Sequence, residues 1–579
     1  MKFQHLYMAE DLESLTVSEL KEILKQENLP VSGKKNDLIA RLRENNSSVA
    51  QIKIPLYNQN KFWRRLKDKT WETKGGYVFS AFHIFIGLIL ILSSAGIGIY
   101  TVNQFSSKVP NYDLVEFDSS RAREYTQMLV DLGNPGRLSG SIEEQATVDA
   151  IQQNFTEMGL MLQYETFSVP MFDILSEPEM GICIPGQYPL GLQSPTPCGT
   201  ADINAEYIEF NHMTDFVLQG YSGSRDIQFW QNEFTIVNLS DGSDDSLWDN
   251  ASGQVGMLWL ESVGVNDNTL FYGKARDSSL AGLIIVITSG NTCKIPSFEG
   301  TCIPFFKTVD VTELGTMPTD IAFIMVSNDV AEVLSNAFGN KDQNDVRLKL
   351  FTDMYNDGTM DVRVPCGVLP GQTDELIIIG GHHDTVYNAP GAVDDSSGVA
   401  NVLELARQFS LLTNEIGPSY YTIKFCTWGG EEEGLHGSKA YVDMHSIELS
   451  ELLRLYVNFD MPHVDIDLEN RGNSVLFYGN GIEDIVHISN IIEVFKQEHP
   501  EISSKYELGY FYQTDEQVAC SSDHCPFVKK IGKDIIGSYG DGSWEYHTYL
   551  DDMSRFNEES LFVTGTILGS YVLYLGWGE

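Results

Sequence analysis

Histidine and carboxylate residues cluster at the ends of several apolar, strand-like runs in the C-terminal half of the chain. The clusters are 382–384 (HHD), 394–398 (DDSSG), 431–434 (EEEG), 458–460 (NFD) and, near the C-terminus, 546–548 (YHT). Each cluster alone is a weak signal, because buried histidines and acidic surface runs are common. Together they offer imidazole and carboxylate ligands without thiolate, which suits Zn²⁺ or a similar divalent ion. The combination predicts a metal-dependent hydrolytic site.

The residues around these clusters have simpler expected roles. Asp384 follows His382 by two positions, so both side chains lie on the same side of an extended strand and Asp384 can orient the imidazole. The alternative for Asp384 is an ordinary strand-end cap. His383 faces the other way, which predicts packing or solvent contact. We expect His463 at the surface and His524 in a structural or cleft-lining position.

The clusters must be positioned by strands that alternate with helices. Apolar runs at 376–380, 422–428 and 452–459 are separated by a helix predicted from about Gly398 to Leu412 and another near Ser438. Continuous apolar strands alternating with helices favour a mostly parallel sheet that is covered on both faces. The chemistry of such a sheet lies at the carboxyl ends of its strands. This predicts an α/β fold with a mostly parallel central sheet flanked by helices.

The 579 residues are enough for several units. Two predicted helices and a strand at 118–170 begin the α/β part, which we divide into 112–204 and 353–579. Between them, residues 205–352 change to short strands and turns with little helical periodicity. The pattern GKARDSSLAGLIIVITSG, followed by a strand and the helix SNDVAEVL, resembles a protease-associated (PA) domain. We call residues 205–352 the insert and expect it to be β-rich.

Five blocks carry a resemblance to a known family. GGHHDT, PGAVDDSSG, WGGEEEGLHGS, NFDM and YHT occur in the order and approximate spacing of the co-catalytic zinc aminopeptidases of metallopeptidase family M28, and SSDHCPF adds a further family-like segment. The resemblance covers about 118–200 and 353–579. It implies a phosphorylase/hydrolase-like zinc exopeptidase fold with two Zn²⁺ per chain. In this pattern, His382 and Asp460 hold one zinc, Glu432 and His547 hold the other, and Asp394 bridges them.

The same resemblance implies the catalytic roles. Glu431 is the general base, Tyr546 is a candidate to stabilise the oxyanion, and Asp384 supports His382. Two close cations activate a shared water and polarise the scissile carbonyl, so hydrolysis needs no covalent intermediate. Glu433 and Asp395 either recognise a substrate amine or form local hydrogen bonds. The predicted function is an aminopeptidase that acts on N-terminal residues of peptides.

Three alternatives to an aminopeptidase have to be considered. A carboxypeptidase of the glutamate carboxypeptidase type has the same fold but needs a cationic pocket for the C-terminal carboxylate, which the acidic outer part disfavours. Glutaminyl cyclases share the fold but use one zinc, which the five-ligand set argues against. From another class, the chain could be an inactive receptor or a module that tethers DNA to the envelope. The retained Glu431 and the ligand set speak against that reading.

The net charge of the chain is positive before, and strongly negative after, an apolar segment long enough to cross a membrane. Residues 1–74 hold 14 Lys/Arg and 10 Asp/Glu, whereas the rest holds 24 and 71, which excludes nucleic-acid binding by the large part. Residues 76–102 are long and apolar enough for one transmembrane helix. A cleaved signal peptide is the rival, but 74 mostly polar residues precede the segment. Seven basic residues in 53–74 predict a cytoplasmic N-terminus and an extracellular or lumenal catalytic domain.

The N-terminal segment 12–46 resembles the SAP motif, a helical hairpin, in the arrangement LxxLK…LPxSGxKxDLIxRL, and a basic linker follows at 47–75. The resemblance implies DNA binding with backbone contacts from the basic residues Lys34, Lys35, Arg41 and Arg43. The alternative is a small protein-interaction or lipid-proximal module with solvated lysines. Peptide substrates, the membrane and this motif's ligand are therefore the expected partners.

All eight cysteines follow the apolar segment, which agrees with an oxidising compartment. Short spacings predict the disulfides Cys183–Cys198, Cys293–Cys302 and Cys520–Cys525. Cys366 and Cys426 lie in apolar runs and are either a further pair or buried thiols.

Overall fold

The structure is a computed structural model that divides into two units, Met1–Pro110 and Asn111–Glu579. It describes residues 112–578 apart from 187–195, 200, 232–233, 299–300, 340–345 and 466–471. Of the first unit it describes residues 34–35, 70–72 and 78–80.

The described part of the first unit contains one antiparallel strand pair. β1 (Thr70–Glu72) pairs with β2 (Val78–Ser80), with Trp71 opposite Phe79. The structure thus has a strand near the start of the segment 76–102, where the sequence predicts a transmembrane helix. Residues 81–102 and almost all of the SAP-like segment lie outside the described residues.

The large sheet of the second unit is mixed, which corrects the expectation of a mostly parallel sheet. Its centre, β13-β12-β14-β17, is parallel as predicted, but the flanking pairs β11-β13, β3-β11, β3-β4 and β15-β17 are antiparallel. The order along the sheet is β16 (Glu507–Tyr512), β15 (Ser474–Gly479), β17 (Ile535–Gly540), β14 (Leu453–Phe459), β12 (Leu376–His382), β13 (Thr422–Trp428), β11 (Arg347–Leu369), β3 (Met161–Ile184) and β4 (Glu206–Phe210), with β6 (Arg225–Ile227) paired to β11.

Alternate residues of the central strands enter two separate cores. In β12, Ile377 and Ile379 pack on one face of the sheet, whereas Leu376 and Ile378 pack on the other. Helices cover both faces, so the strand is apolar throughout. The first face is covered by α6 (Ser119–Leu132), α7 (Ile142–Glu157), α12 (Ser397–Ile416), α15 (Ile482–Glu498) and α18 (Glu558–Trp577), and the second by α13 (His436–Met444), α14 (Ser446–Leu452) and α17 (His524–Lys529). A short helix, α16 (Pro500–Ser503), follows α15.

The C-terminal helix α18 is the one helix among the described residues that is long and apolar enough to span a bilayer. Within its most apolar window, 72% is buried inside the fold, against α6, α12 and α15. We therefore describe it as a core helix, because burial by its own domain explains its composition.

The insert forms a second sheet of five strands. Its order is β5 (Phe216–Leu218), β10 (Ala322–Val326), β9 (Gly282–Ile287), β8 (Val255–Leu260) and β7 (Ile236–Asn238), of which β10, β9, β8 and β7 are parallel. The predicted helix SNDVAEVL is present as α11 (Asn328–Gly339), and the insert has further helices that the sequence does not predict: α8 (Asp245–Asn250), α9 (Val265–Asp277) and α10 (Val311–Leu314). Its relation to a PA domain stays a prediction.

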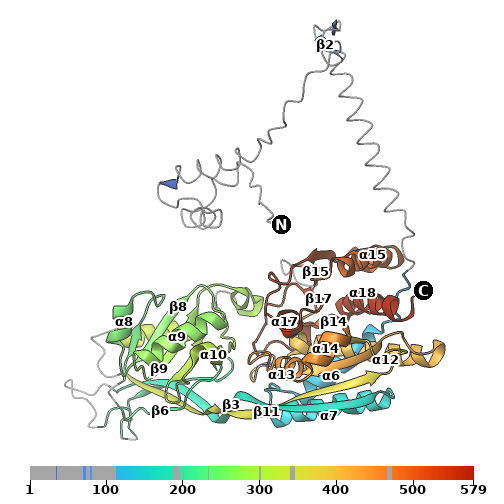
Figure 1. Cartoon of the computed structure of the whole chain (residues 1–579). Coiled ribbons are helices and arrows are strands. Elements are labelled where there is room, and N and C mark those ends of the chain that lie inside the picture. Colours follow the sequence, from blue (N-terminus) through green and yellow to red (C-terminus); the bar gives the residue numbers. More distant parts are fainter. Residues whose placement is uncertain are drawn as a thin grey trace. The chain divides into compact units, whose positions relative to one another are not determined.

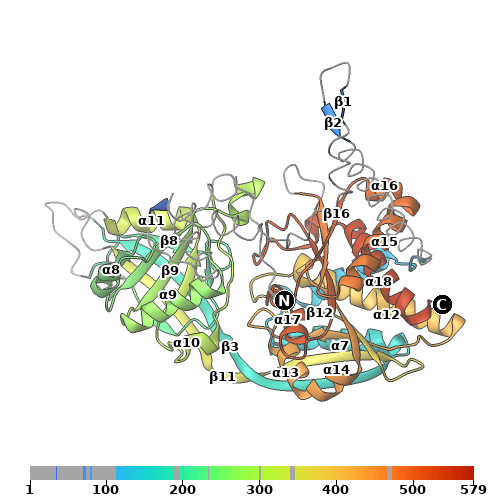
Figure 2. The same ribbon diagram turned by 45° about the horizontal axis from the view of Figure 1, so that its top comes forward.

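Two long strands join the insert to the large sheet. β3 and β11 pair antiparallel from Arg347 opposite Cys183 to Val368 opposite Met161, and both run from one part into the other (Figures 1 and 2). Residues 172–184, part of a segment that the sequence does not assign to an element, are the end of β3 in this ribbon. The pairing of β3 with β11, which has register shifts between Phe351 and Gly358, therefore ties the insert to the large sheet in addition to packing.

All eight cysteines are paired. The three disulfides predicted from spacing are present, and the fourth is Cys366–Cys426. These two residues lie directly opposite each other on β11 and β13, which resolves the alternative left open by the sequence.

Candidate metal centre

The predicted ligands lie where the central parallel strands end. His382 is the last residue of β12, and Asp460 follows β14 directly. Glu432 lies in the loop between β13 and α13, and Asp394 lies in the turn Ala392–Ser396 that leads into α12, where its own backbone is not helical (φ −110°, ψ 96°). Because parallel strands end at one edge of a sheet, these loops meet there, and the loop after β17 brings His547 to the same place.

Asp394 lies between the two imidazoles. Its Oδ1 is 3.1 Å from His382 Nε2 and its Oδ2 is 3.2 Å from His547 Nε2. His547 Nε2 is also 2.8 Å from Glu432 Oε2, and His382 Nε2 is 3.8 Å from Asp460 Oδ1. The structure therefore brings together all five residues that the sequence singles out as ligands.

The donor set fits divalent cations. Ligand atoms of His382, Asp394 and Glu432 lie within 4.8 Å of one another, and so do those of His382, Asp395 and Asp460. Glu432 Oε1 is buried with no hydrogen-bond partner among the described residues. Buried carboxylates without partners are costly unless a cation neutralises them. The nitrogen and oxygen donors, with no thiolate in this part of the structure, match the preferences of zinc.

The electrostatics of the site show the same excess of negative charge. Burial disfavours a charged His382, but the carboxylates of Glu431 and Asp384 outweigh it and raise the pKa of His382 well above its usual value. Burial raises the pKa of Asp394, but hydrogen bonds from His382 and His547 outweigh it and lower that pKa. Burial, and then repulsion by Asp460, raises the pKa of Glu431 well above its usual value.

Asp384 links two parts of the centre. The His382 Nδ1 atom lies 3.1 Å from the Asp384 carbonyl oxygen and 3.6 Å from its Oδ1. The Asp384 carboxylate accepts hydrogen bonds from the backbone N–H groups of Glu431 and Glu432, both at 3.3 Å. Asp384 thus ties His382 to the loop that carries the predicted base.

Two supporting residues were missed by the sequence analysis. Arg137 is fully buried and donates to the carbonyls of His383 (2.7 Å) and Pro390 (2.8 Å) and to Ser396 Oγ (2.8 Å). Burial lowers its pKa to about 10, although nearby carboxylates oppose the shift. Asp551 accepts the backbone N–H of Asp394 at 3.1 Å. Neither residue belongs to a motif, so no local signal marks them.

Other expectations near the site are resolved by local contacts. His383 is buried between Thr427 Oγ1 (2.9 Å) and Glu144 Oε1 (3.0 Å), as packing predicts. Asp395 accepts backbone N–H groups, including that of His382 at 3.2 Å, which favours the local hydrogen-bonding interpretation. The expected surface position of His463 is wrong, because it is 2% exposed and its Nε2 accepts the Asn557 N–H at 2.7 Å.

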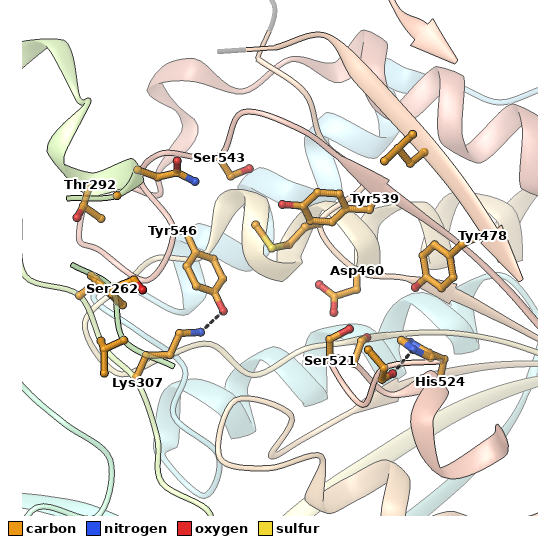
Figure 3. Close-up of a pocket in the computed structure, with 18 of the residues that line it drawn as sticks. Ser262, Thr292, Lys307, Asp460, Tyr478, Ser521, His524, Tyr539, Ser543 and Tyr546 are labelled. Atoms are coloured by element: carbon orange, nitrogen blue, oxygen red, sulfur yellow. Dashed lines mark hydrogen bonds between the residues drawn. The ribbon is translucent and has the colours of Figure 1, made fainter. Parts of the chain in front are cut away.

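Two cavities meet at the ligand cluster. The first, of about 800 Å³, is lined by His382, Asp394, Glu431, Glu432 and His547 together with residues of the insert. The second, of about 580 Å³, is lined by aromatic residues of the large sheet and by polar residues of the insert (Figure 3). The cavities share Lys307, Asp460, Met461, Ser521 and Tyr546. A substrate can therefore extend to both sides of the centre.

Comparisons with known proteins agree with this geometry. Residues 366–572 match the model of peptidase family M28, and residues 11–46 match that of the SAP domain. Aminopeptidase YwaD of Bacillus subtilis (strain 168) is 24% identical over 363 residues, which are 62% of this chain and 70% of that protein. An aminopeptidase of Pseudomonas aeruginosa (strain UCBPP-PA14) is 30% identical over 213 residues, 36% of this chain and 35% of that protein. The structure of BSAP, a zinc aminopeptidase from Bacillus subtilis, shares the fold with a TM-score of 0.56 at 17% identity, covering 80% of this chain and 96% of that chain.

Proposed function

Because residues 366–572 form a peptidase domain of family M28, we propose that this protein is a two-zinc aminopeptidase that removes N-terminal residues from peptides. The observation that carries the proposal is the position of Asp394, with one carboxylate oxygen toward His382 and the other toward His547. A carboxylate in that position can hold two like charges close together. His382 and Asp460 would hold one zinc, and Glu432 and His547 the other.

The chain's own residues supply the proton transfers. When bound, the zinc pair polarises the scissile carbonyl and lowers the pKa of the attacking water. Glu431 lines the cleft beside the ligands, where it takes a proton from the water and passes it to the leaving amine. Burial and the repulsion of neighbouring carboxylates raise the pKa of Glu431, which suits a group that must accept and hold a proton. Tyr546 donates its hydroxyl proton to the oxyanion, and Asp384 keeps His382 and the Glu431 loop in place.

The acidity of the cleft favours an aminopeptidase over a carboxypeptidase. A C-terminal carboxylate needs a free cation, and the cations among the described residues that line the catalytic cavity are Lys307 and Lys439. Lys307 Nζ donates to the Tyr546 hydroxyl and Lys439 Nζ donates to the Gly434 carbonyl. The many carboxylates of the site suit a substrate ammonium group instead.

A panel of free, N-blocked and C-blocked dipeptides tests the proposal on the purified zinc-loaded protein, with Glu431→Gln as the inactive control. We expect N-blocking to abolish turnover and C-blocking to leave it. Turnover that is unaffected by N-blocking overturns the aminopeptidase assignment. Metal analysis should give two zinc ions per chain, and one ion per chain would refute the paired site.

The proposed location rests on the sequence and the disulfides. A transmembrane helix at 76–102 would leave the N-terminus in the cytoplasm and the catalytic unit outside or in a lumen. The four disulfides of that unit support an oxidising compartment. For a catalytic unit outside the cell, protease added to intact cells should digest that unit and spare an N-terminal epitope tag. Digestion of the tag alone would reverse the topology.

The SAP domain at 11–46 supports a second proposal, that the N-terminal segment binds DNA through Lys34, Lys35, Arg41 and Arg43. Binding of the full chain to duplex DNA should weaken steeply as salt increases, because phosphate contacts release counterions. Replacing the four basic residues by Ser should abolish it. Binding that survives the replacement would assign the segment another ligand.

A further inference from the structure

A loop of the insert reaches into the metal centre. The loop carries Phe306 and Lys307, and its backbone is held from within the insert. The Lys307 carbonyl accepts hydrogen bonds from the Gly220 N–H (2.9 Å) and from Asn268 Nδ2 (3.1 Å), and the Lys307 N–H donates to Gln219 Oε1 (3.1 Å). The loop is thus a fixed part of the insert that can hold groups outside it.

Phe306 fixes the orientation of His547. The Phe306 carbonyl lies 2.8 Å from His547 Nδ1, and the Phe306 N–H donates to the His547 carbonyl at 3.2 Å. A carbonyl can only accept, so Nδ1 donates its proton to Phe306, and Nε2, which faces Glu432 and Asp394, is the atom that can ligate a metal. The insert therefore sets the tautomer of one expected ligand.

Lys307 holds the neighbouring residue. Its Nζ lies 2.5 Å from the Tyr546 hydroxyl oxygen and 4.3 Å from the centre of the tyrosine ring. The Tyr546 ring stacks on the His547 ring, with centroids 3.7 Å apart. Figure 3 shows the lysine and tyrosine pointing toward each other at the cavity wall, with Asp460 across the cavity. One loop of the insert therefore positions two adjacent residues of the centre.

The direction of this hydrogen bond matters for the chemistry. An ammonium group has donors and no acceptor, so the Tyr546 oxygen must accept from Lys307. The hydroxyl proton of Tyr546 is then directed away from the lysine and can be donated to a substrate oxygen. A positive charge on the accepting side also strengthens the hydroxyl as a donor.

We propose that Lys307 is a positioning residue for peptide hydrolysis: supplied by the insert, its ammonium group holds the Tyr546 oxygen so that the tyrosine proton faces the oxyanion of the substrate. The inference rests on the proposed function, because it assumes that a peptide carbonyl is attacked at this centre. It makes the insert part of the active site and assigns Lys307 no contact with substrate.

Steady-state kinetics of the full chain, loaded with zinc and acting on a free-amine dipeptide, test the proposal. Lys307→Met keeps the apolar stem but removes the charge and the donors. We expect kcat to fall by about 30- to 100-fold, because one misplaced oxyanion donor costs roughly that much. KM should change by no more than about twofold, since the interaction forms in the transition state. Lys307→Arg, which keeps charge and donors, should recover most of the activity.

A double-mutant cycle separates positioning from other roles. In a Tyr546→Phe background, Lys307→Met should lower kcat no further, because the lysine acts through the tyrosine hydroxyl. Lys274→Met is the matched control: this lysine also belongs to the insert and also lies by an aromatic ring, that of Trp248. It should leave kcat, KM and zinc content unchanged.

Other outcomes of these experiments would contradict either this inference or the proposed function. If Lys307→Met lowers kcat equally in the wild type and in the Tyr546→Phe variant, the proposal is refuted. An increase in KM at constant kcat also refutes it, because Lys307 would then bind the substrate. If Lys307→Met, but not Lys274→Met, loses zinc or thermal stability, the role of Lys307 is structural and the proposal is refuted as well. If the wild-type protein hydrolyses peptides and Lys307→Met has the same kcat, only this inference is refuted. A zinc-loaded wild type that hydrolyses no peptide refutes the proposed function and the inference with it.

Discussion

The large sheet and the sheet of the insert present the carboxyl ends of parallel strands to the same cavity, but with different side chains. Asp460 follows β14 of the large sheet, whereas Ser262 follows β8 and Ser289 and Thr292 follow β9 of the insert. The backbone arrangement at these ends is similar, so it cannot decide what each edge does. The residue types decide it: carboxylates and imidazoles bind divalent cations strongly, whereas neutral hydroxyl groups are weaker ligands and act mainly through hydrogen bonds.

The two regions also differ in what is buried. The insert buries apolar residues such as Ile284, Ile285 and Phe323, and the polar side chains buried with them, such as Gln219 and Asn268, are almost all uncharged. The edge of the large sheet buries charged groups, among them Asp384, Asp395 and Arg137 at 0% exposure. Burying charge is expensive, so we expect the stability of this edge to depend on bound cations and on hydrogen bonds to its charged groups more than the stability of the insert does. Matched substitutions in the two regions test that contrast.

The largest effect should come from the predicted base. Glu431→Gln should lower kcat by about 10³- to 10⁴-fold with zinc content unchanged, because a neutral amide cannot accept the proton of the water. The matched variant Glu261→Gln changes an exposed residue just after β8 of the insert and should leave kcat unchanged. A Glu431→Gln enzyme within tenfold of wild type would remove Glu431 from the mechanism.

Removal of Arg137 should have the next largest effect. Arg137→Met should lower the free energy of unfolding by about 3 kcal/mol, because it leaves buried carbonyls without donors and carboxylates without a nearby cation. Arg276 of the insert donates to the carbonyls of Leu314 (2.8 Å) and Thr316 (2.9 Å) but is partly exposed. Arg276→Met should therefore cost less than about 1 kcal/mol. Urea unfolding measures both, and equal costs would contradict the contrast between the regions.

Zinc removal should destabilise one region selectively. Zinc at 100 times its dissociation constant stabilises the folded state by about 2.7 kcal/mol, and a chelator removes that stabilisation. Amide hydrogen exchange should then accelerate at the ends of β12 and β14 and stay unchanged in β8 and β9. Faster exchange in the insert strands to the same extent would show that both regions depend on the metal equally.

The smallest predicted difference concerns the disulfides. Cys366 and Cys426 are 60 residues apart and join strands of the large sheet, whereas Cys293 and Cys302 of the insert are 9 apart. In the chain-entropy model the longer loop contributes about 2 kcal/mol more stability. The double replacement Cys366→Ala and Cys426→Ala should therefore lower the melting temperature more than the double replacement Cys293→Ala and Cys302→Ala. The reverse order would show that strain or residual structure outweighs loop entropy.

Much of the candidate site was predictable because its residues follow apolar runs of characteristic length. His382, Asp394 and Asp460 are each marked by their place at a strand end or helix start, and the structure brings them together. The parallel centre of the large sheet follows from the same runs. Its antiparallel flanks do not, because β3 and β11 extend into the insert and their pairing depends on where the insert leads the chain.

The amino-acid sequence alone determined the alternation of strands and helices around the site, the residue types gathered there and three of the four disulfides, because these depend on composition and on local spacing. Only the tertiary structure decided that Lys307 forms a hydrogen bond with Tyr546, 239 positions away in the sequence, and that Arg137 forms one with Ser396, 259 positions away. Each of these contacts depends on a single polar residue with no periodicity around it. Such a contact forms only when segments that are distant in the sequence pack together, and the local sequence pattern does not predict which segments do so.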